Sequence, residues 1–455
     1  MYVKKTSKIT MQNIFCVICF AVLFLGFYDN FWSLARKESF NSRSFDEFSE
    51  CLAIGRIARS EKEGVFSHGA LPGVNYDPSV MPPNADIWFE VYLKQRTDYV
   101  ADDIPDSYQT YKSQSGGQFI LYGILQQVLP LGNDIKLQIY YCINAVLSAL
   151  CFTLLLGWVF RNFGLITGII TLLFIMMSSW LTFFGNSLWW GLWASYIPFI
   201  TMLLVMEYNH RTKKLSSGRI LFYLFLSVFA KCVFNGYEFI STALVSTMCP
   251  IIFYSFFEKQ KLRSFISYFI KASLTAIIAV LAQMLILITQ IRIVTGSFAA
   301  GIDYIITSYT RRSFSADDDL ARYPYSFIFK KYLKGDVFQW DFLSRDSHTF
   351  YFAYLILLIA VLGVVVFYLS KNLDQFRKRF NQSLLLTTIV SSIAPISWLI
   401  VFKQHSVNHF HLDYIVWYMP FLLFGFVIVG EGISLILEKF AIYKRTLHPN
   451  SIHTN

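Results

Sequence analysis

The chain has 455 residues, of which 55% are hydrophobic and 15% are charged, and its formal net charge is +10. An ordinary soluble domain carries about 25% charged residues, so this composition excludes a soluble globular protein. The basic residues fall mostly in short clusters between apolar stretches, which indicates membrane topology and argues against a nucleic-acid partner.

Roughly ten stretches of about 17 to 25 residues are nearly free of charge, which is the length that an α-helix needs to cross a bilayer. Backbone amides in lipid must bond within their own segment, and these runs do not alternate as barrel strands do. The sequence therefore predicts an all-α integral membrane protein with about ten transmembrane helices in the lipid bilayer and two large extracytoplasmic loops. The predicted spans are 14–31, 137–160, 164–182, 187–207, 219–235, 239–257, 266–291, 350–370, 383–402 and 413–435.

The charges between the spans predict which way the chain crosses the membrane. Segments 210–214, 258–263 and 371–379 each carry an excess of Lys and Arg, whereas the long loops hold most of the Asp and Glu. By the positive-inside rule, the basic segments and both termini are cytoplasmic. The expected organisation is a cytoplasmic leader 1–13, a first helix 14–31 as a signal anchor, an extracytoplasmic loop 32–136 with juxtamembrane helices, helices 2–7 in 137–291, a second outer loop 292–349, helices 8–10 in 350–435 and a cytoplasmic tail 436–455.

The first outer loop begins with a predicted amphipathic surface helix over 44–64. Ser44 and Glu47 have the spacing of a capping box. Asp46 and Glu50 are four residues apart and share a helix face. Carboxylates on one face just outside a membrane suit a general base or a metal ligand. The alternative is that Glu47 caps the helix while the others are solvated.

An acidic pair at the start of a juxtamembrane helix, followed by Ala58-Arg59, resembles the first outer loop of GT-C superfamily glycosyltransferases. These polyprenyl-phosphate-sugar-dependent enzymes include lipid A aminoarabinose transferases and protein O-mannosyltransferases. In that register Glu50 stands where the family has its acidic pair, and Asp46-Glu47 lies four residues earlier. The resemblance implies a GT-C-like fold and a carboxylate that deprotonates the acceptor hydroxyl: Glu50 or Asp46, then Glu47.

The second outer loop holds the expected phosphate ligands. Arginine binds phosphate in a bidentate manner, so Arg311, Arg312 and the nearer Arg292 are the candidates for the departing lipid phosphate. The alternative is a solvated loop in which these arginines neutralise the aspartates 317–319. Those aspartates would be ligands for a divalent cation, but they lack the EF-hand pattern. We therefore expect no required cofactor or metal, with a divalent cation as the lesser alternative.

A dense polar cluster lies between the last two predicted spans. It contains Lys403, His405, His409, His411 and Asp413. The interpretation that fits the resemblance is a loop that binds a phosphate or sugar hydroxyls. Three histidines could also form a zinc site, although no motif fixes one. The remaining alternative is an interfacial loop at the level of the lipid headgroups.

The hairpin 235–238 lies at the outer rim between two predicted spans. A structural ion pair between Lys231 and Glu238 is the simpler interpretation, and a substrate contact by Glu238 is the alternative.

These features favour a membrane glycosyltransferase that moves a sugar from a polyprenyl-phosphate donor to a hydroxyl of a cell-surface glycan, lipid or protein on the extracytoplasmic face. The alternatives are an oligosaccharide repeat-unit polymerase and a lipid or polysaccharide transporter or flippase. Few mid-span charges and no evident internal repeat weigh against transport. The basic leader and small cytoplasmic loops predict the bacterial inner (cytoplasmic) membrane, with the endoplasmic reticulum as the alternative.

Overall fold

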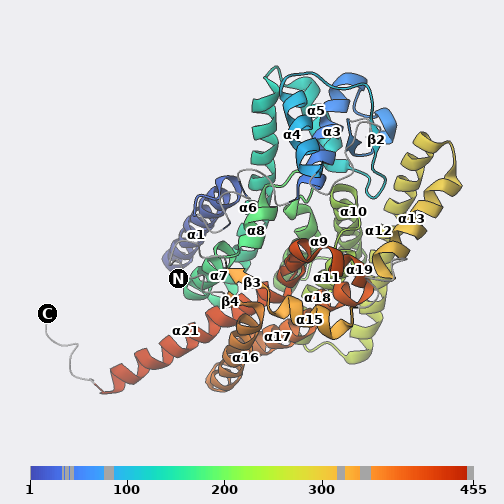
Figure 1. Ribbon diagram of the computed structural model, residues 1–455. Helices are drawn as coiled ribbons and strands as arrows, with labels where there is room; N and C mark the ends of the chain where they lie inside the picture. Colours follow the sequence, from blue (N-terminus) through green and yellow to red (C-terminus); the bar gives the residue numbers. More distant parts are fainter. Residues whose placement is uncertain are drawn as a thin grey trace.

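The computed structural model describes residues 2–32, 35, 40, 46–75, 87–314, 323–338 and 350–447. Within these ranges the chain is mostly helical (Figure 1). The β-structure of the described residues consists of two short antiparallel pairs: β1 (Gly73–Val74) with β2 (Gln109–Thr110), and β3 (Asp336–Phe338) with β4 (Phe350–Tyr351). Ser44 and the aspartates 317–319 lie outside the described residues.

Among the described residues, eight helical segments are long and apolar enough to cross a membrane. A ninth results if α7 (Leu165–Met176) and α8 (Ser179–Gly185), which are bent by 72° at their break, are counted as one span. The eight are Thr10–Asp29 of α1 (Tyr2–Asp29), α6 (Asn133–Phe163), α10 (Ser217–Asn235), α11 (Ile240–Phe257), α12 (Leu262–Thr295), Phe352–Asn372 of α16 (Phe352–Leu369) and η3 (Ser370–Asn372), Gln375–Val401 of α17 (Gln375–Ser391) and α18 (Ile393–Val401), and Phe421–Ala441 of α21 (Phe421–Leu447).

The structure thus confirms a multi-pass helical membrane protein and differs from the predicted spans in two places. The stretch 187–207 corresponds to α9 (Leu192–Thr212), which is not among the eight, because polar residues such as Glu207 and Asn209 occupy its last turns. The last span begins at Phe421 rather than at residue 413, because 410–418 form short helices at the end of the bundle.

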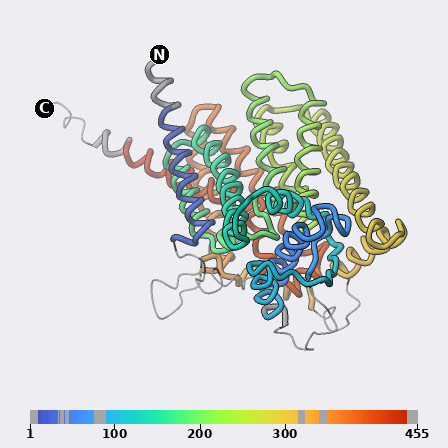
Figure 2. Tube along the Cα trace, turned by 90° about the horizontal axis from the view of Figure 1, so that it is seen from above, coloured from blue at the N-terminus to red at the C-terminus, as the bar shows by residue number. Residues whose placement is uncertain are grey.

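The helices run side by side, and consecutive ones cross the bundle in opposite directions (Figure 2). The turns 213–216 and 258–261 lie at the same end of the bundle as the N-terminus. The described segments between α1 and α6 lie at the opposite end. The polar clusters predicted to carry the chemistry are therefore on the face away from the short basic turns.

Three helices of the chain between α1 and α6 form a layer over the end of the bundle: α3 (Glu47–Glu63), α4 (Ile87–Val100) and α5 (Gly117–Val128) (Figure 1). The prediction of an amphipathic surface helix is wrong for α3, because every residue from Ser49 to Ser60 is buried. Close packing requires a small residue at Gly55, where a Cβ would lie 2.1 Å from the carbonyl oxygen of Gly73.

Two fully buried arginines hold α3 in place. Arg56 donates hydrogen bonds to the carbonyl oxygens of Val65 and Ser67, each at 2.8 Å. Arg59 donates to Asn75 Oδ1 at 2.9 Å and to two carbonyl oxygens of the 105–107 segment. Buried charges are stable only with such partners. These contacts fix the position of the start of α3, where the acidic residues lie.

The remaining described elements complete the same end of the bundle. They are η1 (Ser67–Ala70), α13 (Phe298–Ser313), α15 (Tyr325–Leu333), α19 (Lys403–Asn408), α20 (Phe410–Asp413) and η4 (Tyr414–Tyr418).

Candidate functional site

A cavity of about 660 Å³ lies where the start of α3 meets the 236–239 turn, the end of α13 and the α19–α20 segment. Segments that are far apart in the sequence therefore contribute side chains to one space. Eight of the predicted site residues line it: Asp46, Glu47, Glu238, Arg311, Arg312, His405, His409 and His411.

Asp46 is the N-cap of α3 and lies at the cavity wall. Its Oδ1 accepts a hydrogen bond from the backbone N–H of Ser49 at 3.3 Å, and its Oδ2 accepts one from Nε1 of Trp190 at 2.8 Å. Burial raises the pKa of Asp46 to about 6, although the hydrogen bonds from Ser49 and Trp190 oppose the shift. A carboxylate with this pKa is a competent proton acceptor near neutral pH.

Glu50, the other leading candidate for the base, does not line this cavity. Its Oε1 accepts hydrogen bonds from Ser187 Oγ at 2.6 Å and from the backbone N–H of Leu188 at 2.9 Å. Tyr141 donates to Oε2 at 3.3 Å. Glu50 therefore ties α3 to the turn that precedes α9. Glu47, one residue after Asp46, does line the cavity.

Glu238 forms an ion pair with Arg312 across the cavity wall. Arg312 Nη2 lies 2.7 Å from Glu238 Oε1, and both side chains are largely buried. Burial raises the pKa of Glu238, but the charges of Arg312 and His405 outweigh this and lower the pKa below its ordinary value. The carboxylate is thus held in its charged form chiefly by the guanidinium of Arg312.

The predicted ion pair between Lys231 and the Glu238 carboxylate is not what the structure shows. Lys231 Nζ instead donates to the backbone carbonyl oxygens of Gly236, at 2.8 Å, and of Glu238. It stabilises the hairpin through its main chain and leaves the Glu238 side chain to face Arg312.

His405 lies between two carboxylates. Its Nδ1 is 3.1 Å from Asp413 Oδ2, and its Nε2 is 3.8 Å from Glu238 Oε2. Asp413 Oδ2 also accepts a hydrogen bond from Trp398 Nε1 at 2.6 Å. Arg312, Glu238, His405 and Asp413 thus form a continuous chain of contacts that fixes the orientation of the imidazole.

The other two histidines continue from His405 along the wall. The ring centroids of His405 and His409 are 4.6 Å apart, and those of His409 and His411 are 5.9 Å apart. Burial, with a smaller contribution from the His405 charge, lowers the pKa of His409 to about 4. At neutral pH its imidazole is therefore an uncharged hydrogen-bonding group.

Arg311 is exposed at the cavity, one residue from the paired Arg312. The other predicted cations do not line this space. Arg292 lies over the ring of Phe298, 4.3 Å from its centroid. Lys403 lies over the ring of Tyr325, 5.1 Å from its centroid.

Sequence reasoning missed three aromatic residues that line the cavity: Tyr111, Trp189 and Trp190. The two tryptophans occupy the break between α8 and α9 inside an apolar stretch, so no local pattern distinguished them from membrane residues. The signal in the sequence was the polar interruption Asn186-Ser187 ahead of them, within a predicted span boundary.

Within the described ranges, no three His, Cys, Asp or Glu side chains are arranged to hold a metal ion. The site combines a carboxylate of raised pKa, an exposed arginine and hydrogen-bonding imidazoles around one space. These groups are suited to accept a proton from a hydroxyl and to stabilise a developing negative charge nearby. No family model, no curated protein and no solved structure matches this chain.

Proposed function

We propose that the chain is an integral-membrane glycosyltransferase that moves a sugar from a polyprenyl-phosphate donor to an acceptor hydroxyl. The observation that carries this proposal is the placement of Asp46, a carboxylate with a pKa of about 6, in the same cavity as Arg311. Transfer of this kind requires a base for the acceptor and positive charge for the leaving phosphate, and the cavity supplies both.

In the proposed reaction the acceptor hydroxyl transfers its proton to the carboxylate of Asp46 as its oxygen attacks the anomeric carbon. A new carbon–oxygen bond forms, and the bond between the anomeric carbon and the phosphate oxygen breaks. The electron pair of that bond leaves with the phosphate. Arg311 stabilises the resulting charge, because the neighbouring Arg312 is already paired with Glu238.

Asp46 is a better candidate for the base than the two glutamates. Glu50 accepts three hydrogen bonds from Ser187, Leu188 and Tyr141 and lies outside the cavity wall. Glu47 lines the cavity and raises the pKa of Asp46 through its charge, after the larger effect of burial. We therefore assign proton transfer to Asp46, electrostatic tuning to Glu47 and a structural role to Glu50.

An apolar groove offers a place for the lipid chain of the donor. A cavity of about 370 Å³ between α12 and α13 is lined entirely by aliphatic and methionine side chains, including Leu285, Ile288 and Ile306. The same helix α13 carries Arg311 and Arg312 in its last turn. A lipid bound along this groove would extend its phosphate toward the arginines.

We place the reaction on the extracytoplasmic face of a bacterial cytoplasmic membrane. The support is that the site lies at the opposite end of the bundle from the basic turns 210–214 and 258–263, which the positive-inside rule assigns to the cytoplasm. A glycan, lipid or protein hydroxyl exposed at the cell surface is then the acceptor.

The test is to delete the gene and to locate the lipid-linked sugar that accumulates. If the protein is a transferase that acts outside the membrane, the accumulated donor should be oxidised by membrane-impermeant periodate in intact cells. If the protein is instead a flippase, periodate should reach the accumulated donor only after the cells are lysed. Unchanged surface glycan and unchanged lipid-linked sugar would reject the proposed function.

A further inference from the structure

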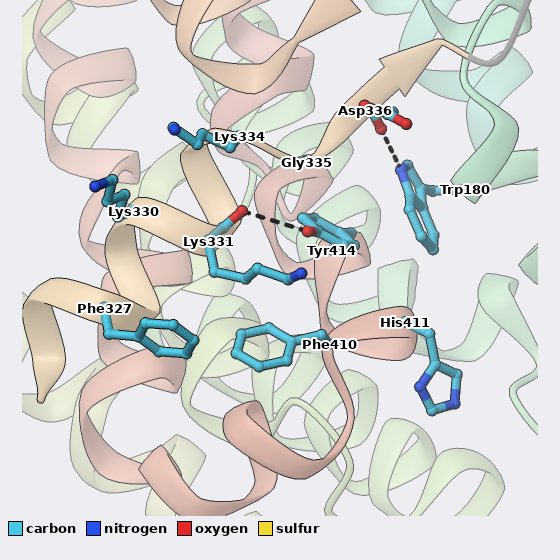
Figure 3. A pocket seen from close by; sticks show the side chains of 10 residues that line it. All are labelled: Trp180, Phe327, Lys330, Lys331, Lys334, Gly335, Asp336, Phe410, His411 and Tyr414. Carbon is cyan, nitrogen blue, oxygen red and sulfur yellow. Dashed lines mark hydrogen bonds between the residues drawn. The ribbon is translucent and has the colours of Figure 1, made fainter. Parts of the chain in front are cut away.

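A second cavity, of about 610 Å³, adjoins the first and shares His411 with it (Figure 3). Its walls come from α15 and the residues that follow it, from the α20–η4 segment and from Trp180 of α8. The proposed mechanism uses none of the basic residues in this space.

One face of α15 supplies the charge. Phe327, Lys330, Lys331 and Lys334 follow the i, i+3, i+4, i+7 spacing that places side chains on one side of a helix, and all four line the cavity. The opposite side is anchored: Tyr332 is fully buried, and its hydroxyl donates to the carbonyl oxygen of Ser406 at 3.0 Å.

Aromatic rings form the wall facing the lysines. The ring centroids of Trp180 and Tyr414 are 4.7 Å apart. Trp180 Nε1 donates a hydrogen bond to the carbonyl oxygen of Asp336 at 2.8 Å. The hydroxyl of Tyr414 donates one to the backbone carbonyl oxygen of Lys331 at 3.4 Å. A Cβ at Gly335 would lie 2.0 Å from the Tyr414 ring, so a glycine is required here. The wall is thus a rigid, built surface.

The charge of the cavity is unbalanced. Three exposed lysines and one aspartate, Asp336, line it, and within the described ranges none of the three lysines forms an ion pair. In Figure 3 the side chain of Lys331 extends between Phe410 and Tyr414, and its Nζ lies 5.6 Å from the Phe410 ring centroid. Lys331 beside the Phe410 ring, with Lys330 and Lys334 exposed on the same helix face, offers positive charge next to an apolar surface, which suits a molecule with an anionic group and an apolar face.

We propose that this cavity binds the acceptor and that the acceptor is an anionic saccharide, with its phosphate or carboxylate on the lysines and its ring against Phe410 or Tyr414. This proposal rests on the proposed function, in which glycosyl transfer takes place in the first cavity. The acceptor is assigned here because the arginines and the apolar α12–α13 groove already provide for the donor. His411, at the junction, lies where an acceptor would pass from one cavity to the other.

The experiment is calorimetric titration of the full chain in phosphatidylcholine nanodiscs with glucose 6-phosphate, glucose and inorganic phosphate. The variant is Lys330→Gln/Lys331→Gln/Lys334→Gln. Its matched control, Lys214→Gln/Lys259→Gln/Lys261→Gln, removes the same charge from exposed residues at the opposite end of the bundle.

The proposal predicts saturable binding of glucose 6-phosphate, at least about tenfold tighter than glucose or inorganic phosphate, which is a difference of about 1.4 kcal/mol. The triple variant should lose that preference, and the control should keep it. Equal binding of glucose 6-phosphate to the triple variant would overturn the lysine site. Equal binding of inorganic phosphate would overturn the saccharide part. Loss of binding when phosphatidylglycerol is added to the discs would identify a lipid headgroup as the occupant and overturn the acceptor assignment.

Asp46→Asn separates this proposal from the proposed function. It should abolish transfer and leave glucose 6-phosphate binding unchanged. If Asp46→Asn retains transfer while the lysine variant loses binding, the anion site stands and the assigned base is wrong.

Discussion

The indole Nε1 of Trp190 lies 2.8 Å from Oδ2 of Asp46, and this hydrogen bond joins the break between α8 and α9 to the N-cap residue of α3. The indole orients the carboxylate toward the cavity and stabilises its charged form. Without that hydrogen bond, burial would raise the pKa of Asp46 further than its present value of about 6. The bond therefore sets both the position and the proton affinity of the proposed base.

The pH dependence of transfer should reflect Asp46. A base acts only when it is deprotonated, so kcat/KM should fall as the pH is lowered through about 6, approaching tenfold per pH unit below it. The measurement is kcat/KM from pH 4.5 to 8 with purified protein. A profile that stays flat through pH 5 would exclude Asp46 as the proton acceptor.

Trp190→Phe should shift that acidic limb to higher pH. Phenylalanine retains the ring that stacks on Phe239, at 5.5 Å between centroids, but donates no hydrogen bond to Asp46. The charged form loses a partner, so the pKa of Asp46 rises. Trp193→Phe is the control, because its Nε1 donates to the neutral amide of Asn144. An unshifted limb in Trp190→Phe would show that the indole does not tune the base.

Glu238→Gln should destabilise the fold by about 3 kcal/mol, because it leaves the buried guanidinium of Arg312 without its carboxylate. Glu238→Gln/Arg312→Gln should be more stable than Glu238→Gln alone, since no buried charge is then unpaired. Thermal unfolding in detergent compares wild type, Glu238→Gln, Arg312→Gln and the double variant. Additive losses in the double variant would mean that the two side chains are not coupled.

Glu50→Gln should retain at least about one tenth of the wild-type kcat, a much smaller loss than removal of a general base causes. The amide oxygen still accepts the hydrogen bond from the Leu188 N–H, so the protein should fold. The expected effect of the lost carboxylate charge is a lower unfolding temperature. Both quantities are measured on the same purified sample. A well-folded Glu50→Gln protein without activity would return the role of base to Glu50.

Local patterns in the sequence predicted the membrane class and picked out eight of the residues that line the candidate cavity. Charge-free runs of spanning length identify helices because lipid excludes unpaired backbone groups. The histidine cluster and the adjacent arginines stood out because such residues are rare beside apolar spans. Their convergence on one cavity depends on helix packing, which no local pattern records.

The choice of carboxylate could not be made from the sequence. Spacing along α3 placed Asp46 and Glu50 on the same face, but burial is not a local property. Glu50 proved to be bonded to the turn at Ser187, more than a hundred residues away, whereas Asp46 faces the cavity. The spacing of residues 327–334 places the lysines on one face of α15. Only the structure shows that this face and the aromatic residues opposite it line the same cavity.

The most direct test is transfer from a polyprenyl-phosphate-linked sugar by purified wild type, Asp46→Asn and Asp103→Asn, with release of polyprenyl phosphate as the readout. Asp103 is an exposed residue between α4 and α5 and serves as the matched control. We predict that Asp46→Asn lowers kcat at least about 100-fold at an unchanged unfolding temperature, while Asp103→Asn is fully active. Full activity of a well-folded Asp46→Asn protein would contradict the assignment of this cavity as the transferase site.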